Sequence, residues 1–147
     1  MAEQKDVLAS FQFALDIGDK LAGFFQECSG IGSENEIIET KLTDANGVDF
    51  VKKEPGRLKW NDVTLKRGIT DSLDIWKWRK DVEEGSVDKA RTNCTISMMN
   101  RAGKPVAIWH FRGAWPSKVS GPELKSDSND YGVEEVVMVH EYMYREK

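Results

Sequence analysis

The sequence predicts a mainly β protein: a β-barrel or β-sandwich of six to seven antiparallel strands with one flanking α-helix at about residues 72–84. Three observations lead to this fold. Apolar and polar residues alternate with period two in most apolar segments. Turn-forming pairs such as Asn46-Gly47 and Pro55-Gly56 separate those segments. Only one segment carries a helical pattern, and the length of 147 residues fits a single domain spanning residues 1–147.

The first half of the chain predicts strands joined by turns. Phe11–Ile17 alternates apolar and polar residues, as expected of a half-buried strand. The following stretch to about residue 42 predicts two strand pieces broken at Gly30 and Gly32, where a bulge or bend is expected. Asn46-Gly47 is a strong hairpin-turn signal and Pro55-Gly56 a second turn. Residues 58–68 then predict a further strand.

The segment 72–84 is the one convincing helix. Asp71 or Ser72 is a plausible N-cap, and Gly85 is a natural residue just past the C-terminus. Its apolar face is expected to lie on a sheet.

The second half returns to strands. Residues 91–112 predict a hairpin with a turn at about 101–105, because alternating segments lie on both sides of that turn. The polar, turn-rich stretch 117–132 predicts a loop. Residues 133–144 predict one long final strand with apolar side chains on both faces over Val136–Val139.

Composition excludes several classes of protein. A net charge of −4 argues against a dedicated nucleic-acid binder, which would carry a high pI. The N-terminus lacks a basic start followed by an apolar run, so we expect no signal peptide and synthesis in a reducing compartment. No apolar run has the length of a membrane span, so no membrane anchor is expected. Cys28 and Cys94 are expected to be buried thiols, and whether they ever pair stays open.

The sequence offers no constellation for catalysis, so no enzyme, cofactor or metal site is expected. His110 and His140 both fall in predicted strands, away from any metal-binding motif or nucleophilic cysteine. Glu134 and Glu135 are adjacent on a strand and point to opposite faces, so they do not form a shared-proton pair. Glu83-Glu84 is expected to be solvated at the helix end.

Several motifs occur in a fixed order along the chain. A Pro-Gly pair leads to a Lys and an aromatic residue, a strand ending in Leu-Lys-Arg-Gly, and a helix with tryptophans. A Gly-Lys-Pro turn, a Trp-x-Phe strand, Ala-Trp-Pro and Gly-Pro-x-Leu follow, and the last strand carries a His-Glu pair. The residues are Pro55-Gly56, Lys59-Trp60, Leu65–Gly68, Trp76, Trp78, Gly103–Pro105, Trp109–Phe111, Ala114–Pro116, Gly121–Leu124 and His140-Glu141.

With these motifs, residues 10–144 resemble the tail-tube proteins of contractile phages and the inner-tube proteins of extracellular contractile injection systems. One departure is Glu54, where relatives often have Leu. The resemblance implies a non-enzymatic structural subunit that forms hexameric rings stacked into a hollow tube. It also implies a sheath around the tube, baseplate or spike and tube-terminator proteins as partners, and DNA or protein cargo in the lumen. The tube would belong to a phage tail or to an extracellular or cell-associated injection particle.

Two sets of residues follow from this interpretation. The segment at about 40–57 is long, mixed in charge and broken by glycine, so we expect an extended loop that reaches a neighbouring subunit. The alternation at 109–112 places two aromatic residues inward and two basic ones outward. The expected inter-subunit residues are Lys41, Asp44, Asp49, Lys52, Lys53, Arg57, His110 and Arg112. The expected core anchors are Trp60, Trp76, Trp109, Phe111 and Trp115.

Two other functions are also compatible with the sequence. The first is a secreted, ring-forming tube protein of a type VI secretion system, which shares the architecture. The second is an unrelated β-barrel enzyme or small-ligand binder, which would need a polar cluster around a pocket. The sequence alone points to no such cluster.

Overall fold

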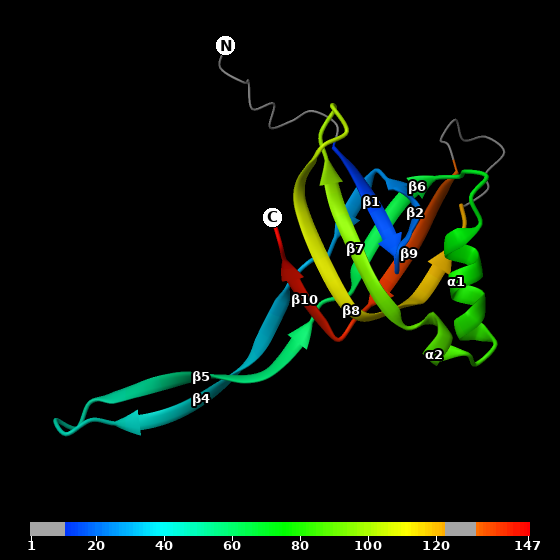
Figure 1. Cartoon of the computed structure of the whole chain (residues 1–147). Coiled ribbons are helices and arrows are strands. Elements are labelled where there is room, and N and C mark those ends of the chain that lie inside the picture. Colours follow the sequence, from blue (N-terminus) through cyan, green and yellow to red (C-terminus); the bar gives the residue numbers. More distant parts are fainter. Residues whose placement is uncertain (1–10, 123–131) are drawn as a thin grey trace, which may run out of the picture.

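The computed structural model describes residues 11–122 and 132–147 as a curved antiparallel sheet flanked by helices, from which a long two-stranded hairpin projects (Figure 1). The predicted mainly β fold is confirmed. The strands are β1 Gln12–Ile17, β2 Lys20–Phe25, β3 Glu27–Ser29, β4 Ser33–Thr43, β5 Asp49–Trp60, β6 Val63–Gly68, β7 Thr92–Met99, β8 Pro105–Ser120, β9 Val133–Val139 and β10 Tyr142–Arg145. The helices are α1 Asp74–Glu83 and α2 Val87–Ala90.

Eight strands form one sheet in the order β2-β1-β7-β8-β9-β6-β3, with β10 also paired to β8. The sixteen-residue β8 is the centre of this sheet. Its first part pairs with β7 and β10, and its last part pairs with β9. The hairpin expected at residues 91–112 is confirmed as β7 and β8. The described residues hold ten strands rather than six or seven, because short breaks divide segments that look continuous in the sequence.

A bend at Gly113 allows β8 to serve both halves of the sheet. Gly113 has a φ of +61°, and a Cβ at this position would lie 2.7 Å from a carboxylate oxygen of Glu141. The pairing between β7 and β8 shifts register at the same place. The final segment breaks at His140 and Glu141 into β9 and β10, so the single final strand expected at 133–144 was wrong. Both strands pair with β8, on either side of its bend.

The turn-rich stretch 117–132 is only partly a loop. Its first residues continue β8 as far as Ser120. Residues 123–131, which include the Glu123-Leu124 end of the Gly-Pro-x-Leu motif, lie outside the described residues.

The core lies between the sheet and the helices, and its largest buried side chains include Phe25, Phe111, Leu15, Leu65 and Ile75. Phe111 is fully buried, and Trp76, Trp109 and Trp115 are half-buried and pack against the core cluster. Trp60 differs from expectation, because it does not belong to that cluster.

Helix α1 begins slightly later than predicted. Its N-cap is Leu73, and no side chain caps it, so the N-cap expected at Asp71 or Ser72 was wrong. Its end agrees with expectation: Gly85 has a φ of +85°, and its N–H donates to the carbonyl of Val82. The four-residue α2 follows directly and escaped prediction because it is too short for a periodic pattern.

A buried ion pair fixes α1 to the sheet. Nε of Arg67 on β6 lies 3.2 Å from Oε2 of Glu134 on β9, and Trp76 on α1 donates its indole N–H to the other oxygen at 2.9 Å. The guanidinium also lies over the ring of Phe25, 4.8 Å from its centroid. A Cβ at Gly23 would overlap Nη1 of Arg67, so only glycine fits beside this cation. Glu135 points to the other face, as predicted.

The first prediction concerns the core position on β8. Replacing Phe111 with Ala removes a fully buried aromatic ring and is expected to lower the free energy of unfolding by about 3–5 kcal/mol. Lys118→Ala, an exposed position on the same strand, is the control and should change it by less than about 0.5 kcal/mol. Urea unfolding of the unassembled subunit measures both. Equal effects of the two substitutions would contradict the assigned faces of β8.

Candidate assembly surfaces

The hairpin of β4 and β5 is separate from the main sheet. The two strands pair only with each other, over eleven and twelve residues, and are joined by a turn at Asp44–Val48. Figure 1 shows the hairpin extending away from the body of the molecule. The segment 40–57 is therefore not an extended loop, as predicted, but the greater part of this hairpin.

The Pro55-Gly56 pair explains that error. Both residues lie inside β5, with Pro55 opposite Ile37, next to an irregularity between Asn35 and Ile37 on β4. A proline is tolerated in an edge strand beside a bulge, where its missing N–H breaks no regular ladder. Local turn chemistry was therefore overridden by pairing with β4.

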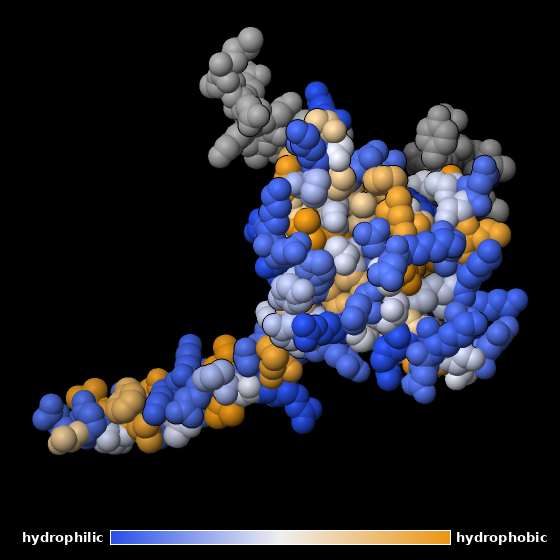
Figure 2. All heavy atoms as spheres, viewed as in Figure 1, coloured by the Kyte–Doolittle hydropathy of each residue, from blue (hydrophilic) through white to orange (hydrophobic). Residues whose placement is uncertain are grey.

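Large apolar side chains are exposed on both faces of the hairpin. Directly paired residues share a face, so Leu42 and Phe50 lie on one face with Ile38, and Ile37 and Val51 lie on the other. Their exposed fractions range from 39% for Leu42 to 66% for Ile37. Figure 2 shows hydrophobic side chains spaced along the projecting arm. A lone two-stranded hairpin is marginal in water, so this arm needs a partner surface.

The acidic residues near the tip organise the turn. One carboxylate oxygen of Asp44 accepts hydrogen bonds from the N–H groups of Asn46 and Val48, at 2.8 and 2.9 Å. Gly47 has a φ of +79°, as the predicted Asn-Gly turn requires. Asp49 accepts a hydrogen bond from the Thr43 hydroxyl at 2.8 Å. The tip therefore has a fixed shape, with two carboxylates on it.

Some of the remaining charged residues of the hairpin interact with one another. Lys52 forms an ion pair with Glu54 at 3.1 Å, and both side chains are more than half exposed. Lys53 stands opposite Glu39 in the pairing register. Lys41 and Arg57 are exposed and make no ion pair in the described part of the chain.

An aromatic cluster that the sequence did not reveal lies at the base of the hairpin. The ring of His140 lies 4.9 Å from that of Phe111 and 5.8 Å from that of Trp60, and Tyr142 lies 5.5 Å from Trp60. Nε2 of His140 is 3.1 Å from the carbonyl oxygen of Asn61. Trp60 therefore connects the hairpin to the body instead of anchoring the core.

His110 and Arg112 lie on the outer face of β8, beside the C-terminal strand β10. The His110 ring stacks on Tyr144 with centroids 5.0 Å apart, and its Nε2 lies 3.2 Å from a carboxylate oxygen of Glu146. The exposed Arg112 guanidinium lies over Tyr142 and Tyr144, 5.4 and 5.8 Å from their centroids. The structure brings these two expected contact residues together, but away from the hairpin tip.

Strands β2, β3 and β10 of the main sheet each pair on one side only within the described residues. β2 ends the sheet on one side, with Leu21 and Phe24 each 48% exposed. β10 pairs only with β8, which leaves its other edge unpaired within the described residues. Unpaired edges carry free N–H and C=O groups, which readily pair with another chain.

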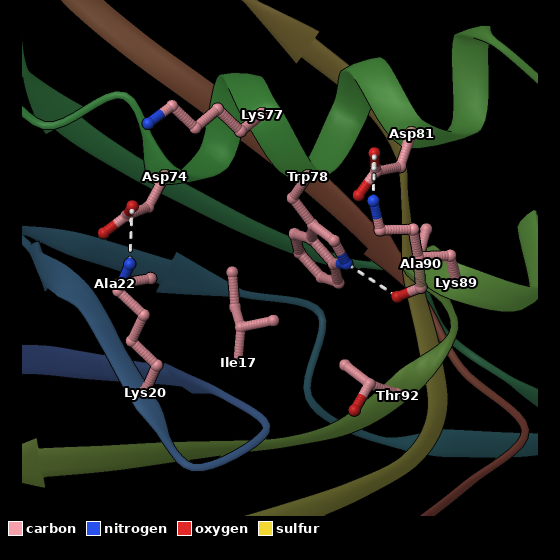
Figure 3. Close-up of a pocket in the computed structure, with 10 residues that line it drawn as sticks. All are labelled: Ile17, Lys20, Ala22, Asp74, Lys77, Trp78, Asp81, Lys89, Ala90 and Thr92. Carbon is pink, nitrogen blue, oxygen red and sulfur yellow. Dashed lines mark hydrogen bonds and ion pairs between the residues drawn. The ribbon is translucent and has the colours of Figure 1, made fainter. Parts of the chain in front are cut away.

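One pocket of about 340 Å³ lies between α1, α2 and the β1–β2 hairpin (Figure 3). Its apolar lining comes from Ile17, Ala22, Trp78 and Ala90, and charged side chains surround it. The sequence did not predict this pocket, because the helices and strands that line it are far apart along the chain. The described residues contain no group of three or more side chains suited to hold a metal ion.

The cysteines are unreactive by position. Cys94 is buried and Cys28 half-buried, and both are free thiols. Burial raises the pKa of each to about 12, so the thiolate is scarce at neutral pH.

A β-rich fold with an uncovered arm and open sheet edges defines a subunit built for assembly. The family model described as "T4-like virus tail tube protein gp19" matches residues 9–144. The chain therefore belongs to this family of tail tube proteins, and it is a tube protein of contractile injection systems. The predicted family is confirmed. No match was found among curated proteins.

Solved structures agree with this assignment. The chain is 25% identical to a chain of the PVC sheath–tube complex of an extracellular contractile injection system, with a TM-score of 0.73 and coverage of 92% of this chain and 88% of that one. A chain of the PVC sheath/tube terminator is also 25% identical, with a TM-score of 0.74 and coverage of 92% and 94%. Hcp1 from Flavobacterium johnsoniae, at 12% identity, TM-score 0.57 and coverage of 92% and 94%, shares the fold. Within the described residues, no helix has the length and apolarity to cross a membrane.

The second prediction concerns His140. Burial lowers its pKa below the usual 6.5, and the nearby carbonyl of Asn61 only partly opposes this shift. The unfolded chain therefore takes up a proton at a pH where the folded chain does not, so the free energy of unfolding falls as pH drops below about 6.5.

His140→Gln removes the titrating group and keeps a donor for the Asn61 carbonyl. Its free energy of unfolding should depend less on pH between 7 and 5 than that of the unmodified chain, in urea titrations at each pH. Parallel pH profiles for the two proteins would contradict the assignment.

Proposed function

We propose that the protein is a non-enzymatic structural subunit whose copies form hexameric rings that stack into a hollow tube. The observation that carries this proposal is the β4–β5 hairpin, which exposes apolar side chains on both faces and pairs with no other strand in residues 11–122 and 132–147. Membership of the tail tube family supports the same conclusion.

Within a ring, the open edges of the main sheet provide one contact. An edge of β2 on one copy pairs with β10 of the next, which extends the sheet from copy to copy into a continuous barrel around the lumen. Such a contact joins two different surfaces, so repeated rotation closes it into a ring. His110 and Arg112, beside β10, then lie at or near the contact between copies.

Between rings, the hairpin provides the second contact. Its apolar residues are covered by an adjacent copy, and its charges meet opposite charges there. The hairpin residues assigned to this contact are Lys41, Asp44, Asp49, Lys52, Lys53 and Arg57. The chain would then form a single domain over residues 1–147, with residues 40–57 as its inter-subunit arm.

The assembled tube is surrounded by a sheath and ends in baseplate or spike and terminator proteins, with DNA or protein cargo in the lumen. The likeness to chains of the PVC sheath–tube and terminator complexes supports these partners. The particle is assembled from subunits made in the bacterial cytoplasm, either as a phage tail or as an extracellular injection particle.

A type VI-like secreted ring protein is the second candidate, supported by the fold shared with Hcp1. The identity of 25% to the PVC chains, against 12% to Hcp1, favours the first candidate. Negative-stain electron microscopy of the purified protein separates them: long hollow tubes support a tail tube, isolated rings support the second candidate, and monomers contradict both.

The third prediction tests the hairpin. Replacing both Leu42 and Phe50 with Thr keeps strand-forming residues but removes exposed apolar surface from one face of the arm. We expect the free energy of unfolding of the subunit to change by less than about 1 kcal/mol, because both side chains are already exposed. Tubes should be absent by electron microscopy. Thr40→Ser, on the same face, is the matched control and should form tubes. Normal tubes from the double variant would contradict the proposed role.

A further inference from the structure

We propose that the pocket between α1 and the β1–β2 hairpin receives the hairpin tip, residues 42–50, of a second copy of the chain. This inference rests on the proposed stacking of subunits and identifies the surface that receives the arm.

The pocket is suited to apolar side chains. Its lining includes Ile17, Ala22 and the indole of Trp78, and its volume of about 340 Å³ has room for more than one side chain. The indole N–H of Trp78 already donates to the carbonyl of Ala90 at 2.7 Å, so the ring needs no polar ligand from outside. Figure 3 shows Trp78 between α1 and the strands, with the charged residues around it.

The rim of the pocket carries an excess of positive charge. Lys20 lies 3.4 Å from Asp74, and Lys89 lies 3.8 Å from Asp81, so these four charges are paired. Lys77, which also lines the pocket, is exposed and makes no ion pair in the parts of the chain that the structure describes. The rim therefore offers one unpaired cation beside an apolar surface.

The tip of the hairpin has the complementary chemistry. Leu42, Val48 and Phe50 are 39%, 58% and 46% exposed. The stretch from Leu42 to Phe50 includes Asp44 and Asp49 but no basic residue. The carboxylate of Asp44 accepts two backbone hydrogen bonds within the turn. Asp49 accepts a single hydrogen bond, from Thr43, so its carboxylate can accept a further one from Lys77 of another copy.

The positions of the two surfaces favour a contact between copies. In Figure 1 the hairpin extends away from the body on the side opposite α1, so the tip does not reach the pocket of its own chain. Eleven residues of β4 extend about 36 Å at roughly 3.3 Å per residue, enough to reach a neighbouring body. A contact between two different surfaces on opposite sides of a subunit repeats from copy to copy and produces a filament.

A disulfide cross-link tests this contact directly. Val48→Cys places a thiol at the tip, and Lys77→Cys places one at the rim. Cys28 and Cys94 give little background, because burial suppresses their thiolates. The variant with both substitutions, assembled and then mildly oxidised, should give a ladder of covalent multimers in non-reducing gels. Each single variant is a control and should give no ladder.

A charge exchange provides a second test. Lys77→Glu and Asp49→Lys each bring like charges together, and each should raise the critical concentration for tube growth on the order of tenfold, a loss expected from like-charge juxtaposition at an interface. The variant with both substitutions restores opposite charges and should recover most of this loss. Lys80→Glu, on α1 but outside the pocket lining, is the matched control and should grow tubes normally.

The outcomes separate this inference from the proposed function. Normal tubes with no ladder and no charge rescue would overturn the pocket contact and leave the tube function intact. If the unmodified protein forms no rings or tubes, the proposed function itself fails. A cross-link from the Lys77→Cys variant to the sheath protein in a sheath–tube complex, without a ladder, would assign the pocket to the sheath and overturn the inference.

Discussion

The bend of β8 at Gly113 is the constraint on which the arrangement of the body depends. Before the bend β8 pairs with β7 and β10, and after it with β9, so a single strand joins both halves of the sheet. The φ of +61° at Gly113 lies in the left-handed region, which glycine adopts without strain. The last segment divides at His140 and Glu141, beside this bend, and β10 pairs with the part of β8 that precedes it.

In the body, a buried ion pair holds α1 against the sheet. Arg67, Glu134 and Trp76 form a buried network in which each charge is paired, so α1 is held on the sheet. With α1 fixed, Trp78 and the elements beside it form a stable pocket. The body thus encloses its own core, whereas the hairpin leaves apolar side chains exposed, and in the proposed assembly other copies cover them.

The sequence predicts the parts of this structure that depend on local pattern. Period-two alternation locates the β7–β8 hairpin, and Gly85 marks the end of α1, because backbone geometry and one-sided burial act within a few residues. The sequence predicts wrongly where contacts between residues far apart in the chain determine the local structure. Pro55-Gly56 looks like a turn but pairs with β4, and Trp60 packs against His140 and Tyr142 rather than the core. The pocket joins β1, β2, α1 and α2, so no single stretch reveals it.

Apolar residues on both faces of the hairpin constrain the assembly further. A strand pair with one apolar face rests on one surface, whereas Ile37 and Val51 lie on one face here and Leu42 and Phe50 on the other. Covering both faces requires two surfaces. If copies stack as proposed, the pocket of one copy in the adjacent ring supplies one surface and the copy beside it supplies the other. In that arrangement each inter-ring contact also depends on the contact within a ring. Under the proposed stacking, a complete ring would therefore bind the next arm more strongly than a single subunit would, because only a ring offers both surfaces.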